Sequence, residues 1–132
     1  MPMSRLQKRL LRLAAAVAAA GAVAGTVLMR AEAPAPRAVT VEMTARRFVF
    51  LPEHVDVMEG DEVTINVHSA DGTHGIEIGK LKLKKTIPRG GEVVTLAFTA
   101  PAPGRYVITC SEYCGRGHDD MKSVLVVAPR TR

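Results

Sequence analysis

Apolar residues take every second position in a series of short runs that begins at residue 39. The first of these runs are VTVEMT from Val39, the pair Phe48 and Phe50, the pair Val55 and Val57, and the triplet Val63, Ile65 and Val67. A period of two is the pattern of a strand with one buried face. Because Pro or a Gly-Asp pair bounds the runs, the pattern predicts short, half-buried β-strands.

Further apolar runs follow at residues 76–83, 93–99, 106–110 and 123–127, and the turn signals PRGG and PAPG separate some of them. This amounts to roughly seven or eight strands in about ninety residues, with no convincing amphipathic helix between them. Such a spacing is typical of a sandwich of two sheets. The sequence therefore predicts an all-β, antiparallel β-sandwich.

The first thirty residues have a different pattern. The opening MPMSRLQKRLLR carries five positive charges, the amino terminus included, and no acid, and seventeen uncharged residues follow from Leu13 to Met29. As a helix this run would be about 25 Å long, which suits either a signal peptide or a single membrane anchor. An AxA-like site, Ala31-Glu32-Ala33, precedes Pro34, which fits poorly in an extended cleavage groove. We therefore expect an uncleaved anchor.

These patterns divide the chain into three parts. Residues 1–30 are predicted to be a basic flank with one hydrophobic membrane helix, residues 31–38 a stiff Ala/Pro tether, and residues 39–129 the β domain. The basic flank is expected to stay in the cytoplasm, which places the domain on the periplasmic, extracytoplasmic face of the plasma membrane. If the segment is cleaved, the domain is released into the periplasm.

The charge of the chain is concentrated in its N-terminal part. The formal net charge is +5, but residues 1–37 hold six Lys/Arg against one acid, while residues 38–132 hold twelve of each. The β domain is therefore neutral overall, so its composition does not indicate a nucleic-acid partner. Lys80, Lys82, Lys84 and Lys85 form one short basic run, which we interpret as a solvated strand face, with a docking surface for an acidic partner as the alternative.

Chemistry is concentrated between Cys110 and Met121, in the sequence CSEYCGRGHDDM. Two thiols, an imidazole and a thioether lie within twelve residues, and this mixture of soft sulfur with nitrogen suits copper better than magnesium or calcium. Gly115 and Gly117 favour a loop over a helix, because two glycines let the backbone fold back on itself. The spacing CxxxCxxxHxxM therefore predicts a loop that wraps a metal.

This loop resembles the dinuclear copper A site of cytochrome c oxidase subunit II, which nitrous oxide reductase shares. A second match is SADGTHGIEI, where a histidine precedes a glycine at a strand edge, and the resemblance extends from about Val39 to Val127. It implies two copper ions and a cupredoxin-like, Greek-key sandwich. The ligands that it implies are His74, Cys110, the backbone carbonyl of Glu112, Cys114, His118 and Met121.

Two simpler interpretations compete for the cysteines. They could form a disulfide in an oxidising compartment, although a disulfide does not require His118 and Met121 at their positions. A blue copper site takes one cysteine and would leave Cys110 without a role. The remaining histidines, His54 and His68, lie on polar positions and are expected at the surface or in simple hydrogen bonds. Met43 and Met58 are expected to pack in the core or at its edge.

No set of residues in the chain suggests bond-making chemistry, because there is no Ser-His-Asp order, no phosphate-binding loop and no apolar carboxylate pair. The resemblance implies that the chain accepts electrons from cytochrome c or a similar donor and passes them to a haem/copper catalytic subunit I. Two other functions stay open: a free-standing, membrane-tethered electron carrier, and a copper-handling protein that binds or delivers the metal. Asp119 and Asp120 could orient a ligand or face a partner.

Overall fold

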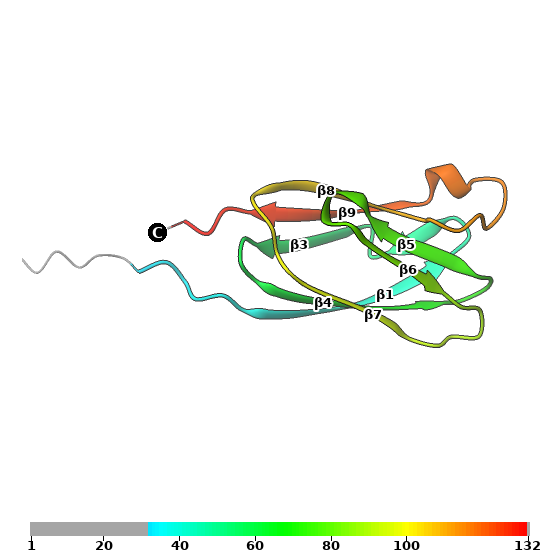
Figure 1. The fold of residues 1–132 in the computed structure, drawn as a ribbon, viewed down its shortest axis with the longest axis horizontal. Coiled ribbons are helices and arrows are strands. Elements are labelled where there is room, and N and C mark those ends of the chain that lie inside the picture. The colour runs from blue at the N-terminus through cyan, green and yellow to red at the C-terminus, as the bar shows by residue number, and fades with distance from the viewer. Residues whose placement is uncertain (1–31, 132) are drawn as a thin grey trace, which may run out of the picture. The chain divides into compact units, whose positions relative to one another are not determined.

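Nine β-strands make up most of residues 32–131, which are the residues that the computed structural model describes (Figure 1). They are β1 (Ala38–Arg46), β2 (Val49–Leu51), β3 (His54–Met58), β4 (Glu62–Ser69), β5 (His74–Ile78), β6 (Leu83–Ile87), β7 (Val94–Thr99), β8 (Gly104–Thr109) and β9 (Lys122–Ala128). Two single turns of 3-10 helix complete the set, η1 (Gly79–Leu81) and η2 (His118–Asp120). No helix among residues 32–131 has the length and hydrophobicity to cross a membrane. The membrane helix expected within residues 1–30 lies outside this part of the chain.

The strands form two sheets, with the orders β2-β1-β4-β7 and β3-β9-β8-β5-β6. The all-β sandwich is confirmed, but its pairing is not purely antiparallel. Strands β1 and β4 run parallel in the first sheet, and β3 and β9 run parallel in the second. The alternation of apolar residues reports which face of a strand is buried and does not report the direction of its neighbour.

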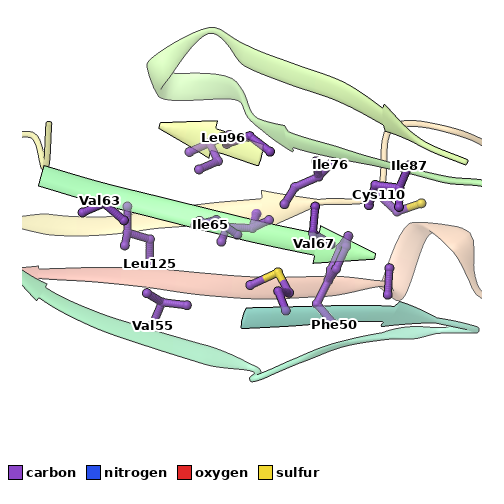
Figure 2. Close-up of a cluster of buried hydrophobic side chains, with 14 of the residues drawn as sticks. Phe50, Val55, Val63, Ile65, Val67, Ile76, Ile87, Leu96, Cys110 and Leu125 are labelled. Atoms are coloured by element: carbon purple, nitrogen blue, oxygen red, sulfur yellow. The ribbon is translucent and has the colours of Figure 1, made fainter. Parts of the chain in front are cut away.

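The core lies between the two sheets, and the predicted alternation places its side chains there. In β4 the buried residues Val63, Ile65 and Val67 alternate with half-buried polar residues. Figure 2 shows these side chains facing others from the second sheet, such as Ile76 of β5 and Leu125 of β9. Burying this apolar surface contributes roughly 25 cal/mol per Å², so the contact between the sheets is the main source of stability.

The run at residues 76–83, predicted as one strand, is in fact two strands joined by a turn. Strand β5 ends at Ile78, η1 follows, and β6 begins at Leu83 and returns antiparallel to β5. Lys82 adopts a left-handed conformation with φ of 55° at this turn. The basic run therefore extends over a turn and an edge strand, and Lys84 and Lys85 are both exposed.

A buried charge cluster lies at the end of the sandwich where the chain enters and leaves (Figure 1). The fully buried Asp61 carboxylate accepts hydrogen bonds from the backbone N–H groups of Met58 and Arg37, both at 2.9 Å, and forms ion pairs with the side chains of Arg37 and Arg130. Those hydrogen bonds, the backbone ones first, hold the pKa of Asp61 well below its ordinary range. Arg130 also donates to the carbonyls of Pro34 and Ala35. The cluster therefore fixes both termini of the domain.

Candidate metal centre

The loop from Cys110 to Met121 projects from a paired hairpin at the opposite end of the sandwich. Strands β8 and β9 pair up to Thr109 and Lys122, and the Cys110 N–H donates to the Met121 carbonyl at 3.2 Å just beyond them. The two ends of the loop are therefore held side by side. Figure 1 shows the loop and η2 at the end away from the described termini.

The structure brings together the donor atoms that the sequence analysis named. The Cys114 Sγ lies 3.8 Å from the Cys110 Sγ, 3.8 Å from the Met121 Sδ and 3.8 Å from the His118 Nδ1. The Cys110 Sγ–H donates to the Glu112 carbonyl at 3.1 Å. One ligand atom each from His74, Cys110 and Cys114 lies within 4.8 Å of the other two.

Glu112 faces the cluster with its backbone carbonyl, while its carboxylate contacts a different strand. Its Oε1 accepts a hydrogen bond from the Thr86 hydroxyl of β6 at 3.4 Å. The backbone carbonyl of Glu112, and not its carboxylate, therefore contacts the sulfur cluster, and its role as a ligand stays a prediction. The two cysteines are free, and their 3.8 Å separation is far longer than the S–S bond of about 2.05 Å in a disulfide.

His74 carries the clearest sign that this cluster binds something. The side chain is fully buried at the start of β5, and its Nε2 bonds to the Asp71 carboxylate at 2.6 Å. Its other nitrogen, Nδ1, is buried without a hydrogen-bond partner among the described residues. A buried polar atom without a partner is costly and uncommon in native proteins. A metal ion at the sulfur cluster is the partner that these donor types fit.

Asp71 is a positioning residue that the sequence analysis missed. Burial raises the pKa of its carboxyl, but hydrogen bonds from the Arg47 N–H, His74 and the Gly72 N–H outweigh burial and bring the pKa to about 2. The carboxylate therefore stays ionised and accepts a hydrogen bond from the Nε2–H of His74, which leaves the Nδ1 lone pair free. The only signal for it in the sequence is an acid three residues before the histidine.

The thiol of Cys114 is protonated in the metal-free chain. Burial, followed by the nearby Cys110, raises its pKa to about 11, although the positive charge of Arg47 acts in the opposite direction. A metal is bound by the thiolate, so binding has to release this proton.

Close backbone contacts set the shape of the loop. Gly115 and Gly117 have φ values of 133° and 108°, and a Cβ on Gly117 would lie 2.8 Å from the ring of Phe48. Phe48 therefore packs against the loop, whereas Phe50 is part of the core. A Cβ on Gly75 would come within 2.2 Å of the Ser111 Oγ and 2.8 Å of the Glu112 N. Glycine after His74 thus lets the loop approach β5.

The other candidate residues lie outside the cluster, as expected. His54 is exposed, and His68 is half-buried with its Nε2 3.5 Å from the Thr44 hydroxyl. Met43 belongs to the core, and Met58 is half-buried. The side chains of Asp119 and Asp120, in η2, are exposed, and neither forms an ion pair within residues 32–131.

Comparison with known proteins places this geometry in a family. Residues 16–127 match the cupredoxin-like domain family. A subunit 2 of cytochrome c oxidase from Thermus thermophilus is 34% identical over 93 residues, which are 70% of this chain and 67% of that protein. The chain belongs to the cytochrome c oxidase subunit 2 family. A second Thermus subunit 2 aligns over the same number of residues at 34% identity, but only 54% of its length is covered.

Solved structures of other proteins share the fold of this chain. The periplasmic domain of cytochrome oxidase subunit II from Bradyrhizobium japonicum superposes with a TM-score of 0.63 at 18% identity and covers 74% of this chain and 88% of that one. A chain of a heme-copper terminal oxidase dimer gives a TM-score of 0.61 at 22% identity, with 93% of each chain covered. At these identities the likeness shows the cupredoxin-like fold alone.

Proposed function

We propose that this chain binds two copper ions in a copper A centre and transfers single electrons as the electron-entry subunit of a cytochrome c oxidase-type complex. The observation that supports this most directly is a pair of buried thiols 3.8 Å apart with further donors around them. A thiolate sulfur binds a first-row metal ion such as zinc at about 2.3 Å. One ion could therefore contact both sulfurs, which lie 3.8 Å apart. In the proposed centre the His74 Nδ1 would cap one copper ion and the His118 Nδ1 the other, while the Met121 Sδ and the Glu112 carbonyl would complete their ligand sets.

The bound coppers supply one-electron redox chemistry, and the residues of the chain keep their ligands in place. His74 is set by Asp71, and the loop is closed by the backbone bond between Cys110 and Met121. Phe48 limits movement of the loop from one side. Because a rigid ligand set changes little between oxidation states, the cost of reorganisation on electron transfer is low.

A blue copper site is the weaker alternative for this geometry. Such a site uses one cysteine, but here both thiols are buried in one cluster, and both approach further donors. Cys110 contacts the Glu112 carbonyl, and Cys114 contacts the Met121 thioether. Both cysteines therefore lie beside potential metal ligands, which supports the proposal that both bind metal.

The family supports the partners and the location that we propose. Its members named above are oxidase subunits, and one solved relative is described as a periplasmic domain. We extend this to an extracytoplasmic domain, anchored by residues 1–30, that accepts electrons from cytochrome c or a similar donor. The acceptor is a haem/copper catalytic subunit. A free-standing, tethered carrier would use the same centre with a different acceptor.

Copper analysis combined with spectroscopy tests the proposal. The chain of 132 residues, reconstituted with copper, is expected to hold two copper ions and to show the purple colour and the mixed-valence signal of a copper A centre. One copper per chain with the spectrum of a blue site contradicts it. Purification in mild detergent from the native membrane tests the assembly, because a catalytic subunit is expected to accompany the chain.

A further inference from the structure

A pocket of about 440 Å³ opens on the surface directly beside Cys114. Its lining consists of Arg47, Gly72, Thr73, Arg89, Tyr113, Cys114 and Gly115. Two of these side chains are positively charged and none is acidic. The pocket thus joins a cationic surface to a residue of the candidate metal centre.

Tyr113 is the most exposed large aromatic residue in the described part of the chain, with 77% of its surface accessible. It immediately precedes Cys114 in the sequence, and its ring centroid lies 5.7 Å from that of His118. Exposed aromatic residues of this kind are common at contact surfaces, where they bury a large area at a small entropic cost. The ring therefore offers a partner a contact next to two potential ligands.

Arg47 connects the pocket to the metal loop. Its Nε donates to the Cys114 carbonyl at 2.9 Å, and its backbone N–H donates to Asp71 at 2.8 Å. Arg89 is exposed on the connection between β6 and β7 and forms no ion pair with any residue from 32 to 131. A partner's carboxylate would therefore meet a guanidinium whose charge is not already compensated.

No acidic residue is among those that line the pocket. Asp71 and Glu112 are not part of the pocket lining: Asp71 accepts hydrogen bonds from His74 and from the backbone N–H of Arg47, and the Glu112 carboxylate contacts Thr86. The acids of η2, at residues 119–120, are not part of the pocket lining. The lining therefore carries two positive charges and no negative one, although the domain as a whole is neutral.

We propose that this pocket docks an acidic redox protein, with a partner carboxylate held between Arg47 and Arg89 and the partner surface packed on Tyr113. The planar guanidinium fork suits a carboxylate, and complementary charge speeds the encounter. One electron leaves the partner's cofactor and enters the centre ligated by Cys114, and no bond forms or breaks. The inference rests on the proposed function and narrows the donor to one with an acidic surface.

A pair of probes that differ in charge alone tests the docking surface. The first is a basic cytochrome c, and the second is the same protein with its lysines succinylated, which replaces positive charges with negative ones. Dissociation constants are measured by calorimetry with the copper-loaded and the copper-free chain of 132 residues at low and high salt. We expect the succinylated form to bind on the order of tenfold more tightly at low salt, and this preference to fade at high salt.

Two charge-reversal variants test whether binding of the succinylated probe depends on the pocket. Arg89→Glu, in the pocket, is expected to weaken binding of the succinylated probe on the order of tenfold or more. Arg105→Glu changes the charge by the same amount on exposed β8, at the opposite end of the domain, and is expected to change binding by less than about twofold. Electron-transfer rates measured by stopped flow are expected to follow the same order.

Tighter binding of the unmodified basic probe, or equal effects of the two reversals, overturns the proposal. Arg89-dependent binding to vesicles of anionic lipid, with no preference between the two probes, also overturns it and assigns the pocket to a membrane surface. Copper content and absorption spectra of each variant separate this outcome from failure of the proposed function. A chain that lacks the two coppers can still bind the probe, and a chain that holds both can fail to bind it.

Discussion

Each end of this sandwich buries a group of polar atoms, but only at one end do all of these atoms have hydrogen-bond partners among residues 32–131. At the end that holds the termini, donors from Arg37, Met58 and Arg130 all reach the Asp61 carboxylate. At the opposite end, the His74 Nδ1 and the Ser111 Oγ are buried with no partner among residues 32–131. Both ends bury polar groups, so burial does not distinguish them.

The difference lies in what satisfies each group. A buried carboxylate that is fully paired fixes the structure around it, and removing a partner leaves an uncompensated charge. Buried polar atoms without partners have lost their hydrogen bonds to water, and no protein group replaces those bonds. The first arrangement is a structural clamp, and the second is a site that needs a ligand. Substitutions at each end should therefore affect different properties.

The largest expected effect is the loss of the copper centre in Cys110→Ser and in Cys114→Ser. Each change removes a thiolate from the cluster, and a hydroxyl is too hard and too basic a ligand to replace it. The mixed-valence electron paramagnetic resonance signal is expected to disappear in both variants. His54→Ala and His68→Ala are the controls and should keep the wild-type spectrum. A wild-type spectrum in either serine variant contradicts the proposed bridges.

At the opposite end, Asp61→Asn should lower stability without altering the copper spectrum. The folded pKa of Asp61 lies below its ordinary value near 3.8, so the charged carboxylate contributes stability above about pH 4, and this contribution is lost as the pH falls further. The melting temperature of the variant should therefore fall well below that of the parent at pH 6 and converge with it towards pH 2. A gap that persists unchanged at pH 2 contradicts this account of the clamp.

Gly75→Ala should weaken the copper site and leave the clamp intact. Its Cβ would overlap the Ser111 hydroxyl and the Glu112 backbone, so the loop has to move away from His74. We expect copper affinity to fall by about 10- to 100-fold, as for other changes that displace metal ligands, in a competition assay with a chelator. Gly79→Ala is the matched control, because nothing lies within 4 Å of its Cβ. Equal affinities of the two variants would show that the close approach at Gly75 is not needed.

Met121→Leu should have a smaller effect. A thioether is a weaker ligand than a thiolate or an imidazole, so the variant is expected to keep two coppers and mainly shift the reduction potential. Copper analysis and voltammetry measure these two properties separately. Loss of both coppers in this variant would reverse the ranking of bridging and capping ligands.

Glu112→Gln should have the smallest effect, because its carbonyl and not its carboxylate faces the cluster. The substitution keeps the size of the side chain and removes one negative charge near the centre. The spectrum is expected to stay nearly unchanged while the potential rises modestly, because the reduced centre carries less positive charge. Loss of a copper ion would show that the carboxylate coordinates.

The sequence by itself determined the parts of this protein that depend on local order. The ligand types and their spacing in CSEYCGRGHDDM predict a copper-binding loop. Residues this close along the chain can converge when glycines let the backbone between them fold back. The period-two runs likewise predict the buried faces of the strands. The structure confirms the sandwich and brings Cys110, Cys114, His118 and Met121 together. The anchor expected in residues 1–30 stays a prediction.

Tertiary structure decided the features that join distant segments. The parallel partners of β1 and β3 and the break at Gly79 depend on which strands meet, and periodicity does not record this. Arg47 reaches Cys114 across 67 positions of sequence, and the Gly75 backbone meets the metal loop from another strand. The resemblance predicted His74 as a ligand, but its free Nδ1 depends on Asp71 and on complete burial. Such contacts arise only when the two sheets pack, because packing sets the distances between groups that the sequence keeps apart.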